Sequence, residues 1–411
     1  MKIGMLTHYF DPEGGAAATP GVLARSLADR GHELRVVTGY PNYPGGKVHE
    51  GYSPIRYMSE DLNGMTVHRV PIYPSHDERA GRRMLNFLSY AVSSTLRAPT
   101  LFRDVDVQFV YFSPATATTA AIPLAYLKRT PTVLLVQDMW PDSVTTSGFL
   151  PPRLNKATEK ILTFYCAVLY RAATYVAVTS PGMAGLLAAR GVPKEKLVFV
   201  PNWSNESAFF RTTRDERSRR ELGFEKPFTV MYAGNFGEMQ DLDVVLDSAK
   251  MLGHRSDIEF VLVGAGVKES HLRERAERDG LTNLRFLPPR PFTEMAKTLA
   301  LADCQLVTAK DSAIMRTTLP SKLQANMAAG CPVIGVIAGD GAEVIKAAGC
   351  GLVSQPGDAS QLAEAVETLA GYSQEELSNL SRRAERYYQE NFSESVAGDR
   401  LEGLLESAAK V

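Results

Sequence analysis

The segment Leu319-Pro320-Ser321-Lys322-Leu323 combines the start of a helix with a positive charge. Proline is favoured in a first helical turn, and serine is typical of a helix N-terminus. A lysine there is unfavourable beside the positive end of the helix dipole, and it becomes favourable when an anion is bound. Lys310, at the end of the preceding expected strand, can reach the same point. The spacing predicts a diphosphate site at Lys310 and Lys322, with a pair of solvated lysines as the alternative.

Three glycine-containing loops follow expected strands and could bring backbone N–H groups close to a phosphate. They are Gly14-Gly15, Gly234-Asn235-Phe236-Gly237 and Gly264-Ala265-Gly266. Open α/β sheets bind ligands at the carboxyl ends of their strands, so the loops together favour a ligand site. The first loop lacks the G-x-G-x-x-G spacing of dinucleotide-binding enzymes, which disfavours a dehydrogenase, and a plain tight turn is its alternative interpretation.

The segment Gln137-Asp138-Met139-Trp140-Pro141-Asp142 follows an expected buried strand and should line the ligand cleft. A carboxylate in such a place can orient or deprotonate a hydroxyl. Asp138 is the first candidate for that role, with structural helix capping as the alternative. His8, which ends the first expected strand, is a second candidate for the same cleft, although a lone histidine is more often structural.

Metal, disulfide and hydrolase chemistry have little support in the sequence. Two D-x-D strings, Asp104-Val105-Asp106 and Asp241-Leu242-Asp243, lack a convincing context, and the seven histidines show no metal-ligand spacing. No G-x-S-x-G string occurs. The four cysteines form no C-x-x-C pair, so we expect four buried thiols. We therefore expect no metal site.

The elements that must position these residues alternate between strand and helix in two successive sets. In the first set the expected strands are Lys2–Thr7, Leu34–Thr38, Met65–Val70, Val107–Phe112, Thr132–Val136, Tyr175–Val178 and Leu197–Val200, and the expected helices are Ala16–Arg30, Arg79–Arg103, Arg153–Ala172 and Pro181–Arg190. The polar, arginine-rich segment Pro201–Arg220 carries no strong period and predicts an interdomain linker.

The second set repeats the pattern. Its expected strands are Phe228–Ala233, Glu259–Val263, Leu284–Leu287, Cys304–Thr308 and Pro332–Val336, with helices between them and at the end of the chain. Alternating strands and helices imply parallel sheets that are covered on both faces. We therefore predict an α/β fold of two Rossmann-like parallel-sheet domains that face each other across a cleft.

Composition and charge narrow the choice of partner. The 411 residues are 45% apolar and 22% charged, which excludes disorder, collagen and coiled coil. Residues 1–203 hold 21 Lys and Arg against 15 Asp and Glu, whereas residues 204–411 hold 24 against 31. The basic first half favours an anionic membrane or an anionic substrate. Nucleic acid is disfavoured, because no basic block with interleaved aromatics occurs.

Arg79-x-x-Arg82-Arg83 begins a segment that suits an interfacial helix, with Met84, Leu85, Phe87, Leu88 and Tyr90 as its apolar residues. A partly buried helix with a charged start is the alternative. No run of 18 apolar residues occurs, and Met1–Phe10 matches a first strand rather than a signal peptide. We expect a cytoplasmic protein with peripheral contact to the inner face of an anionic membrane.

These motifs together resemble the retaining nucleotide-sugar glycosyltransferases of the GT-B fold, in glycosyltransferase family four. The resemblance covers nearly the whole chain, and it includes Tyr40-Pro41-Asn42-Tyr43-Pro44 and Phe199-Val200-Pro201-Asn202-Trp203 besides the segments above. It is strongest for colanic-acid fucosyltransferases and N-acetylfucosamine transferases of bacterial surface polysaccharides. The family's closing helices usually return to the first domain. The resemblance implies domains 1–203, with a crossover helix at about 389–411, and 204–388.

The resemblance implies transfer of a hexose-type sugar, deoxy and amino-deoxy forms included, from a nucleoside diphosphate to a glycan or polyprenyl-linked acceptor with retention. No cofactor is implied besides this donor co-substrate. The first domain would bind the acceptor, and the second the nucleotide, with its base near Leu287–Arg290. Asp138, Lys322 and His8 are the candidate catalytic residues. The expected donor-binding residues are Gly14, Gly15, Gly234, Asn235, Phe236, Gly237, Gly264, Arg290, Lys310, Thr317, Thr318, Leu319, Pro320, Ser321 and Lys322.

The sequence also departs from the family pattern. The family's E-x7-E glutamates match Thr317 and Ala325 here, and Gln137 stands in place of its usual first-domain histidine. The family's arginine and lysine on the loop after the first strand of the second domain match Asn235 and Gln240 here. We therefore expect Lys310 and Lys322 to provide the positive charge that binds the phosphates. Two alternatives stay open: a sugar-nucleotide epimerase of the same architecture, which needs no acceptor, and a non-catalytic sugar-nucleotide binding module. A glycogen-type phosphorylase is disfavoured by length and by the lack of a cofactor lysine motif.

Overall fold

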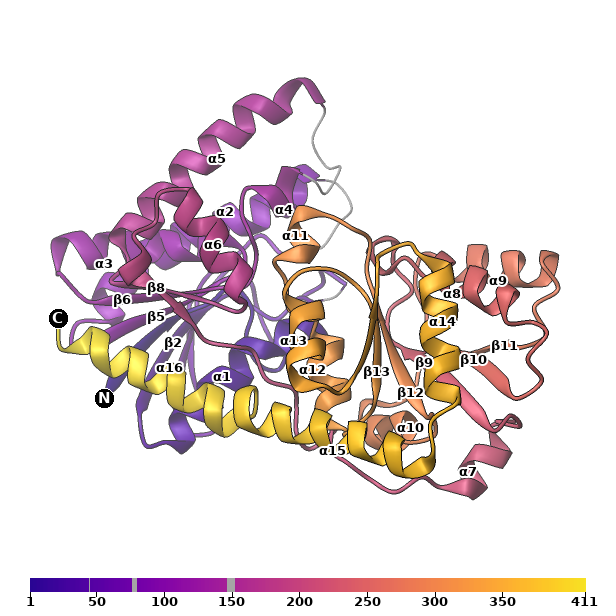
Figure 1. Ribbon diagram of the computed structural model, residues 1–411. Coiled ribbons are helices and arrows are strands. Elements are labelled where there is room, and N and C mark those ends of the chain that lie inside the picture. The colour runs from indigo at the N-terminus through magenta and orange to yellow at the C-terminus, as the bar shows by residue number, and fades with distance from the viewer. Residues whose placement is uncertain (44, 76–79, 146–151) are drawn as a thin grey trace. The chain divides into compact units, whose positions relative to one another are not determined.

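The computed structural model describes residues 1–43, 45–75, 80–145 and 152–411 of the chain. These residues form two compact units (Figure 1). Unit 1 comprises Met1–Val200 together with Gly398–Val411, and unit 2 comprises Pro201–Ala397. Each unit has its own sheet and its own apolar core.

Unit 1 is built on an eight-stranded sheet with the order β3-β4-β2-β1-β5-β6-β7-β8. Its strands are β1 Lys2–Leu6, β2 Glu33–Thr38, β3 Met58–Leu62, β4 Met65–Arg69, β5 Val107–Phe112, β6 Thr132–Val136, β7 Tyr175–Val178 and β8 Leu197–Phe199. All neighbours are parallel except β3 and β4, which pair antiparallel at the sheet edge. Strand β3 is polar and partly exposed, so the sequence carries no apolar signal for it.

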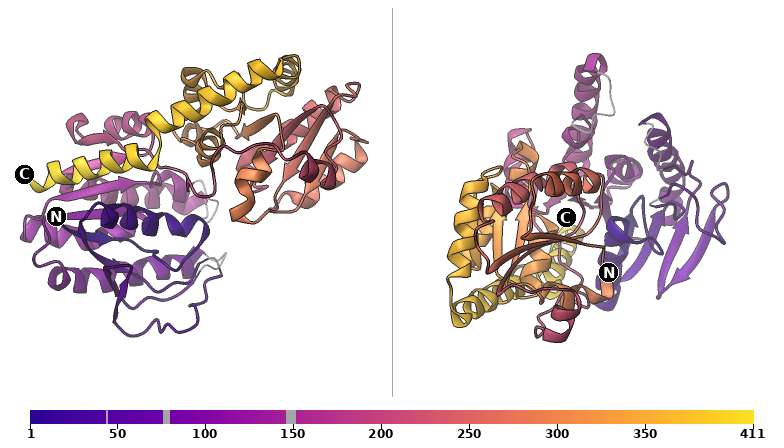
Figure 2. Two further views of the ribbon diagram at one scale, coloured as in Figure 1. Left: turned by 90° about the horizontal axis from the view of Figure 1, so that it is seen from below. Right: turned by 90° about the vertical axis from the view of Figure 1, so that its right-hand side faces the viewer.

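The helices of unit 1 are α1 Thr19–Asp29, α2 Ala80–Leu101, α3 Ala121–Leu127, α4 Asp142–Thr145, α5 Pro152–Ala172, α6 Pro181–Ala189 and most of α16 Glu394–Ala409, with 3₁₀ turns at η1 Gly15–Ala18, η2 Ala115–Ala120 and η3 Lys194–Lys196. The helix expected at Ala16–Arg30 begins as η1 and becomes α-helical only at Thr19. Helix α5 extends outward from the body of unit 1 (Figures 1 and 2).

The C-terminal residues are held in unit 1 by ion pairs. Arg30 Nη2 lies 3.4 Å from Asp399 Oδ1, and His32 Nε2 lies 2.8 Å from Glu402 Oε1. These contacts join the end of α1 and the start of β2 to α16, the yellow helix in Figure 1. The chain therefore returns to unit 1 after completing unit 2.

Unit 2 is built on a six-stranded, entirely parallel sheet with the order β11-β10-β9-β12-β13-β14. Its strands are β9 Phe228–Ala233, β10 Ile258–Val263, β11 Leu284–Leu287, β12 Cys304–Thr308, β13 Val333–Val336 and β14 Gly351–Ser354. Its helices are α7 Glu216–Glu221, α8 Asp243–Met251, α9 Glu269–Arg278, α10 Met295–Leu299, α11 Ala313–Arg316, α12 Ser321–Ala328, α13 Asp340–Ala348, α14 Ala359–Ala370 and α15 Gln374–Asn391, with 3₁₀ turns at η4 Glu238–Gln240 and η5 Phe292–Glu294.

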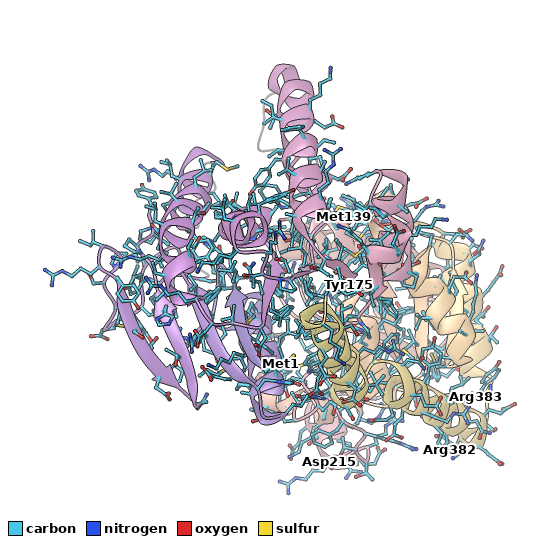
Figure 3. The ribbon with its side chains drawn as sticks, turned by 90° about the vertical axis from the view of Figure 1, so that its left-hand side faces the viewer. Met1, Met139, Tyr175, Asp215, Arg382 and Arg383 are labelled. Carbon is cyan, nitrogen blue, oxygen red and sulfur yellow. The ribbon has the colours of Figure 1, made fainter. Side chains whose placement is uncertain are left out.

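The segment expected as a linker, Pro201–Arg220, is instead a packed part of unit 2. Asp215, labelled in Figure 3, caps α7 by accepting a hydrogen bond from the Arg217 N–H at 3.0 Å. Arg219 is buried and donates to the carbonyl of Leu301 at 2.6 Å. The polar composition of this segment therefore reflects specific hydrogen bonds rather than a solvated connection.

Parallel pairing brings the loops that follow the strands to one edge of each sheet. The fold class predicted from the sequence is confirmed, because both units are parallel-sheet α/β bodies and every expected strand is present. All four cysteines are buried free thiols, as their spacing indicates. Within the described ranges, every helix is too short or too polar to cross a bilayer.

Candidate functional site

Lys322 lies in the first turn of α12 with its side chain turned into unit 2. Its Nζ lies 5.0 Å from the centroid of the Tyr232 ring, and burial lowers the pKa of the ammonium group. Among the residues that the structure describes, no Asp or Glu carboxylate lies within ion-pair distance of this nitrogen. A half-buried cation beside a helix N-terminus and without a carboxylate partner is the arrangement that an anion completes.

Gly234 provides the space that Lys322 occupies. Its φ is +148°, and a Cβ at this position would lie 2.2 Å from Cε of Lys322. Steric contacts also require glycine at positions 264 and 266. A Cβ on Gly264 would lie 1.9 Å from the Gly234 carbonyl oxygen, and a Cβ on Gly266 would lie 2.5 Å from the Phe236 carbonyl oxygen. The two glycine loops of unit 2 therefore pack backbone against backbone. This gives Gly264 a packing role, and the ligand contact that the sequence predicts for it stays a prediction.

The loop Gly234–Gly237 is held by hydrogen bonds to its neighbour. Gly234 N–H donates to the Val263 carbonyl at 2.9 Å, and Phe236 N–H donates to the Ala265 carbonyl at 2.8 Å. The Phe236 side chain is fully buried in the core, so only its backbone can face a ligand. Gly237 lies against the side-chain amides of Asn235 and Gln240. A Cβ on Gly237 would lie 2.8 Å from Asn235 Nδ2 and 2.4 Å from Gln240 Oε1.

Lys310 has a different partner from Lys322. Its Nζ lies 3.3 Å from Glu238 Oε2, and Lys268 Nζ lies 2.7 Å from Glu238 Oε1. Glu238 and Lys268 are therefore additional charged groups at this edge of the sheet, and no motif in the sequence singles them out. In this structure the ammonium groups of Lys310 and Lys322 have separate contacts, and a diphosphate bound by both stays a prediction.

The segment Thr317–Pro320 connects α11 to α12. The hydroxyls of Thr317 and Thr318 donate to the Ile314 carbonyl at 3.1 Å and 2.8 Å, so both are used in closing α11. Leu319 is half-buried and Ser321 is exposed. A small pocket with about 10 Å³ of space lies beside this segment and is lined by Ala309, Lys310, Asp311, Met315, Arg316, Pro320, Ile337 and Ala338. That volume is about what one water molecule needs.

Arg290 lies beyond the end of β11, where the resemblance implies that the nucleotide base is bound. Its Nη2 donates to Glu294 Oε2 at 2.8 Å. Gly264 N–H donates to the Leu287 carbonyl at 3.0 Å. This hydrogen bond connects the end of β11 to the loop Gly264-Ala265-Gly266. Arg290 therefore has an internal ion-pair partner at the place where a base would lie.

Asp138 follows β6 in unit 1 and is bonded to its neighbouring strand end. The Ser113 hydroxyl, which follows β5, donates to Asp138 Oδ2. Burial raises the pKa of Asp138, while the Ser113 hydrogen bond and the charge of Arg83 lower it to a smaller extent. A carboxylate with a raised pKa at the carboxyl edge of the sheet suits a proton-accepting role.

His8, a catalytic candidate from its position after the first strand, is buried in unit 1. Its side chain is 1% exposed, and its ring lies 4.5 Å from that of Tyr9, 5.3 Å from that of Phe87 and 5.0 Å from that of Tyr90. Burial lowers the pKa of His8 to about 3, so the ring is neutral at ordinary pH. The structure places this residue among aromatic side chains of unit 1.

Glu13 is a buried carboxylate directly before Gly14-Gly15. Its Oε1 accepts hydrogen bonds from the backbone N–H groups of Asn42 at 2.6 Å and Tyr43 at 3.3 Å. Burial raises the pKa of Glu13 to about 7. Gly14 and Gly15 are exposed, and Gly15 has a φ of +61°. Glu13 therefore connects the loop Gly14-Gly15 to the segment after β2. The sequence does not single out this glutamate, because its burial is visible only in the structure.

One aspartate of each D-x-D string is paired with basic side chains. Asp104 pairs with Lys2 at 2.9 Å and also with Arg35, at the start of β1, away from the loops that follow the strands. Asp243 pairs with Arg275 at 2.7 Å and His271 at 2.9 Å. Over the described parts of the chain, no three His, Cys, Asp or Glu side chains gather in a way that could hold a metal ion.

Two family models match successive parts of the chain. The model of the glycosyl transferase 4-like domain matches residues 14–203, and that of the glycosyl transferases group 1 matches residues 214–387. WcaI of Escherichia coli (strain K12), named as a colanic acid biosynthesis glycosyl transferase, is 31% identical over 337 residues, which cover 80% of this chain and 82% of WcaI.

Two solved structures are similar over nearly the full length. Sucrose-phosphate synthase from Thermosynechococcus elongatus has a TM-score of 0.72 at 15% identity and covers 99% of this chain and 98% of its own. Anabaena HepE in complex with UDP and glucose has a TM-score of 0.69 at 16% identity, and the match covers 99% of this chain and 100% of the HepE chain. These likenesses show the shared fold, and the sequence matches show the family: the chain belongs to the group 1 glycosyltransferases and has the GT-B fold.

Proposed function

We propose that this glycosyltransferase moves a hexose-type sugar from a nucleoside diphosphate to a glycan or polyprenyl-linked hydroxyl, with retention at the anomeric carbon. The product would be a surface polysaccharide or a related glycoconjugate. Similarity to WcaI supports the polysaccharide class, and the UDP and glucose in the HepE complex support a nucleotide-sugar donor. The sequence resembles transferases of fucose and N-acetylfucosamine. Nucleotide-linked deoxy and amino-deoxy sugars are therefore the first donors to test.

The observation that carries this proposal is Lys322. A cation that is half-buried beside a helix N-terminus and lacks a carboxylate partner among the described residues is costly in the free protein. The cost is removed when an anion binds, and the N–H groups of the first turn of α12 add to the attraction. A diphosphate supplies the required charge, so we assign its binding to Lys322 and the Ser321 N–H.

The chemistry requires stabilisation of the leaving group. The bond between the anomeric carbon and the diphosphate oxygen breaks, and a bond from the acceptor oxygen forms on the same face of the sugar. Negative charge develops on the departing diphosphate, which fixed cations and N–H groups stabilise more in the transition state than in the ground state. Lys322 can do this without a metal ion, and metal-independent transfer is part of the proposal.

Asp138 is our candidate for the acceptor side. The acceptor hydroxyl must lose a proton as its oxygen attacks, and the proton passes either to the departing phosphate oxygen or to a carboxylate. Burial raises the pKa of Asp138, which makes it a better proton acceptor than an ordinary aspartate, and Ser113 fixes the orientation of its carboxyl group. We therefore propose that Asp138 orients the acceptor hydroxyl or removes its proton.

Helix α2 supports the proposed contact with an anionic membrane. Leu85, Leu88, Val92 and Leu96 are 53%, 48%, 61% and 73% exposed, and their spacing puts them on one side of the helix. Phe87 and Tyr90 are buried, so α2 has a second apolar side that packs in unit 1. Arg82 and Arg83 lie in its first turns. An exposed apolar stripe beside basic residues fits the interface of an anionic bilayer.

The proposal is tested by a binding and transfer assay. Purified protein is titrated with UDP-, GDP- and dTDP-sugars, and the sugar–nucleotide pair that binds is then offered with glycan and polyprenyl-linked acceptors. We expect one donor to bind and the labelled sugar to appear on an acceptor with its anomeric configuration unchanged. Epimerised donor without any acceptor would indicate the epimerase alternative, and tight binding without turnover on any acceptor would indicate a binding module.

A matched lysine variant controls for general charge effects. Lys346 lies on α13 of the same unit, is 59% exposed and pairs with Glu343 at 2.9 Å. Lys322→Met and Lys346→Met remove the same charge and leave side chains of the same type. We expect only the former to lose donor binding. Equal donor affinity in the two variants would remove Lys322 from the site.

A further inference from the structure

Glu238 joins two lysines that come from loops on either side of it. The sheet order places β9 between β10 and β12. Glu238 follows β9, Lys268 follows β10 and Lys310 follows β12. Each carboxylate oxygen of Glu238 has its own lysine, since Oε1 lies 2.7 Å from Lys268 Nζ and Oε2 lies 3.3 Å from Lys310 Nζ. One carboxylate therefore pairs with two cations, and the three groups keep a net charge of +1, at the edge of the sheet where α/β proteins bind ligands.

The backbone fixes the position of both lysines independently of their side-chain contacts. Lys268 N–H donates to the Phe236 carbonyl and Lys310 N–H donates to the Met239 carbonyl, both at 2.9 Å. The carbonyls belong to the segment that carries Glu238. If the carboxylate were removed, the lysine backbones would stay beside this loop, and only the ammonium groups would be free to turn.

The ion pairs are open to solvent. The side chains of Glu238, Lys268 and Lys310 are 57%, 29% and 46% exposed. Exposed pairs of this kind contribute little net stability, so a competing anion can displace the carboxylate without disturbing the core. A diphosphate has more negative charge and more acceptor oxygens than a carboxylate, and lysine ammonium groups bind phosphates well as point charges.

We propose that Glu238 holds Lys268 and Lys310 in the donor-free protein, and that both lysines turn from Glu238 to the donor diphosphate when it binds. Glu238 is then a competing anion built into the site, and Lys268 is a donor-binding residue. The inference rests on the proposed use of a nucleoside diphosphate donor. It also predicts selectivity, because a weakly charged ligand does not displace the carboxylate, whereas a diphosphate does.

The test is calorimetric titration with UDP, GDP and dTDP at low and high salt. Glu238→Gln keeps the shape of the side chain and removes its charge, and it should bind the preferred nucleotide about 3- to 10-fold more tightly. Lys268→Ala should bind it about 5- to 20-fold more weakly. In the Lys268→Ala background, the gain from Glu238→Gln should shrink, because one of the two released cations is missing.

Glu269→Gln is the matched control. Glu269 is the neighbour of Lys268 in sequence, and it pairs with Arg273 at 2.9 Å rather than with a lysine of the site. It carries the same long-range charge as Glu238, so the control measures the general effect of removing one negative charge. We expect its affinity for the nucleotide to stay within about twofold of the unmodified protein.

The outcomes separate this inference from the proposed function. If the unmodified protein binds a nucleotide and Glu238→Gln gains no more than Glu269→Gln, the inference is wrong and the proposed function stands. If only Glu238→Gln binds, competition by the carboxylate is supported directly. If no variant binds any of the three nucleotides at either salt concentration, both the proposed donor class and the inference are wrong.

Discussion

The ε-carbon of Lys322 lies over the α-carbon of Gly234, so close that a Cβ on Gly234 would be 2.2 Å from it. Lys322 lies in the first turn of α12, and Gly234 follows β9. The two residues are 88 positions apart in the sequence. The lysine can lie against Tyr232 only because this glycine has no side chain. The pair connects the glycine loop and the helix N-terminus, the two features that predict phosphate binding.

Gly234→Ala should therefore disturb both the fold and the donor site. The new methyl group would overlap Lys322, and the φ of +148° is unfavourable for alanine. We expect a loss of about 1–3 kcal/mol in the free energy of unfolding, measured by urea denaturation, together with weaker donor binding. Gly185→Ala in α6 is the control, because nothing lies within 4 Å of its added Cβ and its stability should not fall.

Lys322→Met should separate activity from stability. Loss of a charge that acts on the leaving group should lower kcat/KM by about 10²–10³-fold. Because the variant also removes a half-buried cation without a carboxylate partner among the described residues, its melting temperature should be unchanged or higher. Lys322→Arg should recover only part of the activity, since the planar guanidinium is larger than the ammonium group beside Gly234. Activity close to that of the unmodified protein in Lys322→Met would contradict the assignment.

Glu13 should make the stability of the protein depend on pH. Its pKa is raised from the ordinary value of 4.5 to about 7, so the folded state binds this proton more tightly than the unfolded state. Between about pH 4.5 and 7, the Glu13 contribution to the free energy of unfolding should fall as pH rises, by roughly 2–3 kcal/mol in total. Glu13→Gln should lack this component. Parallel pH profiles of the two proteins in urea denaturation would show that Glu13 titrates normally.

The exposed stripe on α2 should control membrane binding. Val92→Glu combined with Leu96→Glu places two negative charges on the stripe and should reduce co-sedimentation with anionic vesicles. Binding by the unmodified protein should weaken as salt rises, because salt screens the attraction of the basic residues. Leu127→Glu on α3 is the control, since Leu127 is 83% exposed and lies outside the stripe. Equal binding to neutral vesicles at every salt concentration would rule out electrostatic docking.

Sugar transfer should survive removal of divalent metal. One aspartate of each D-x-D string is engaged by basic side chains, Asp104 by Lys2 and Arg35 and Asp243 by Arg275 and His271. The cationic role in our proposal belongs to lysine. We expect turnover in the presence of EDTA to stay within about twofold of the untreated rate. Loss of turnover with EDTA and its recovery with Mg²⁺ or Mn²⁺ would show that a metal takes part.

The amino-acid sequence by itself determined most of the strands and their order, although it did not predict the edge strands β3 and β14. Apolar runs such as Val107–Phe112 and Ile258–Val263 form strands, because both of their faces become buried in a parallel sheet. The glycine loops and the Pro320-Ser321 helix start are equally local, since they depend on backbone conformations that few residues adopt. The two-domain class and the position of the loops at strand ends follow from these local signals alone.

Only the tertiary structure decided which side chains meet. Strand order brings Lys268 and Lys310 to Glu238 from distant parts of the chain, and no periodicity records such contacts. Burial also depends on residues that are distant in the sequence. His8 and Glu13 both lie in the loop after β1. Aromatic residues from α2 enclose His8, whereas a backbone N–H group after β2 donates to Glu13. Hydrogen bonds, charge and burial act between neighbours in space, and the packing of the elements determines those neighbours.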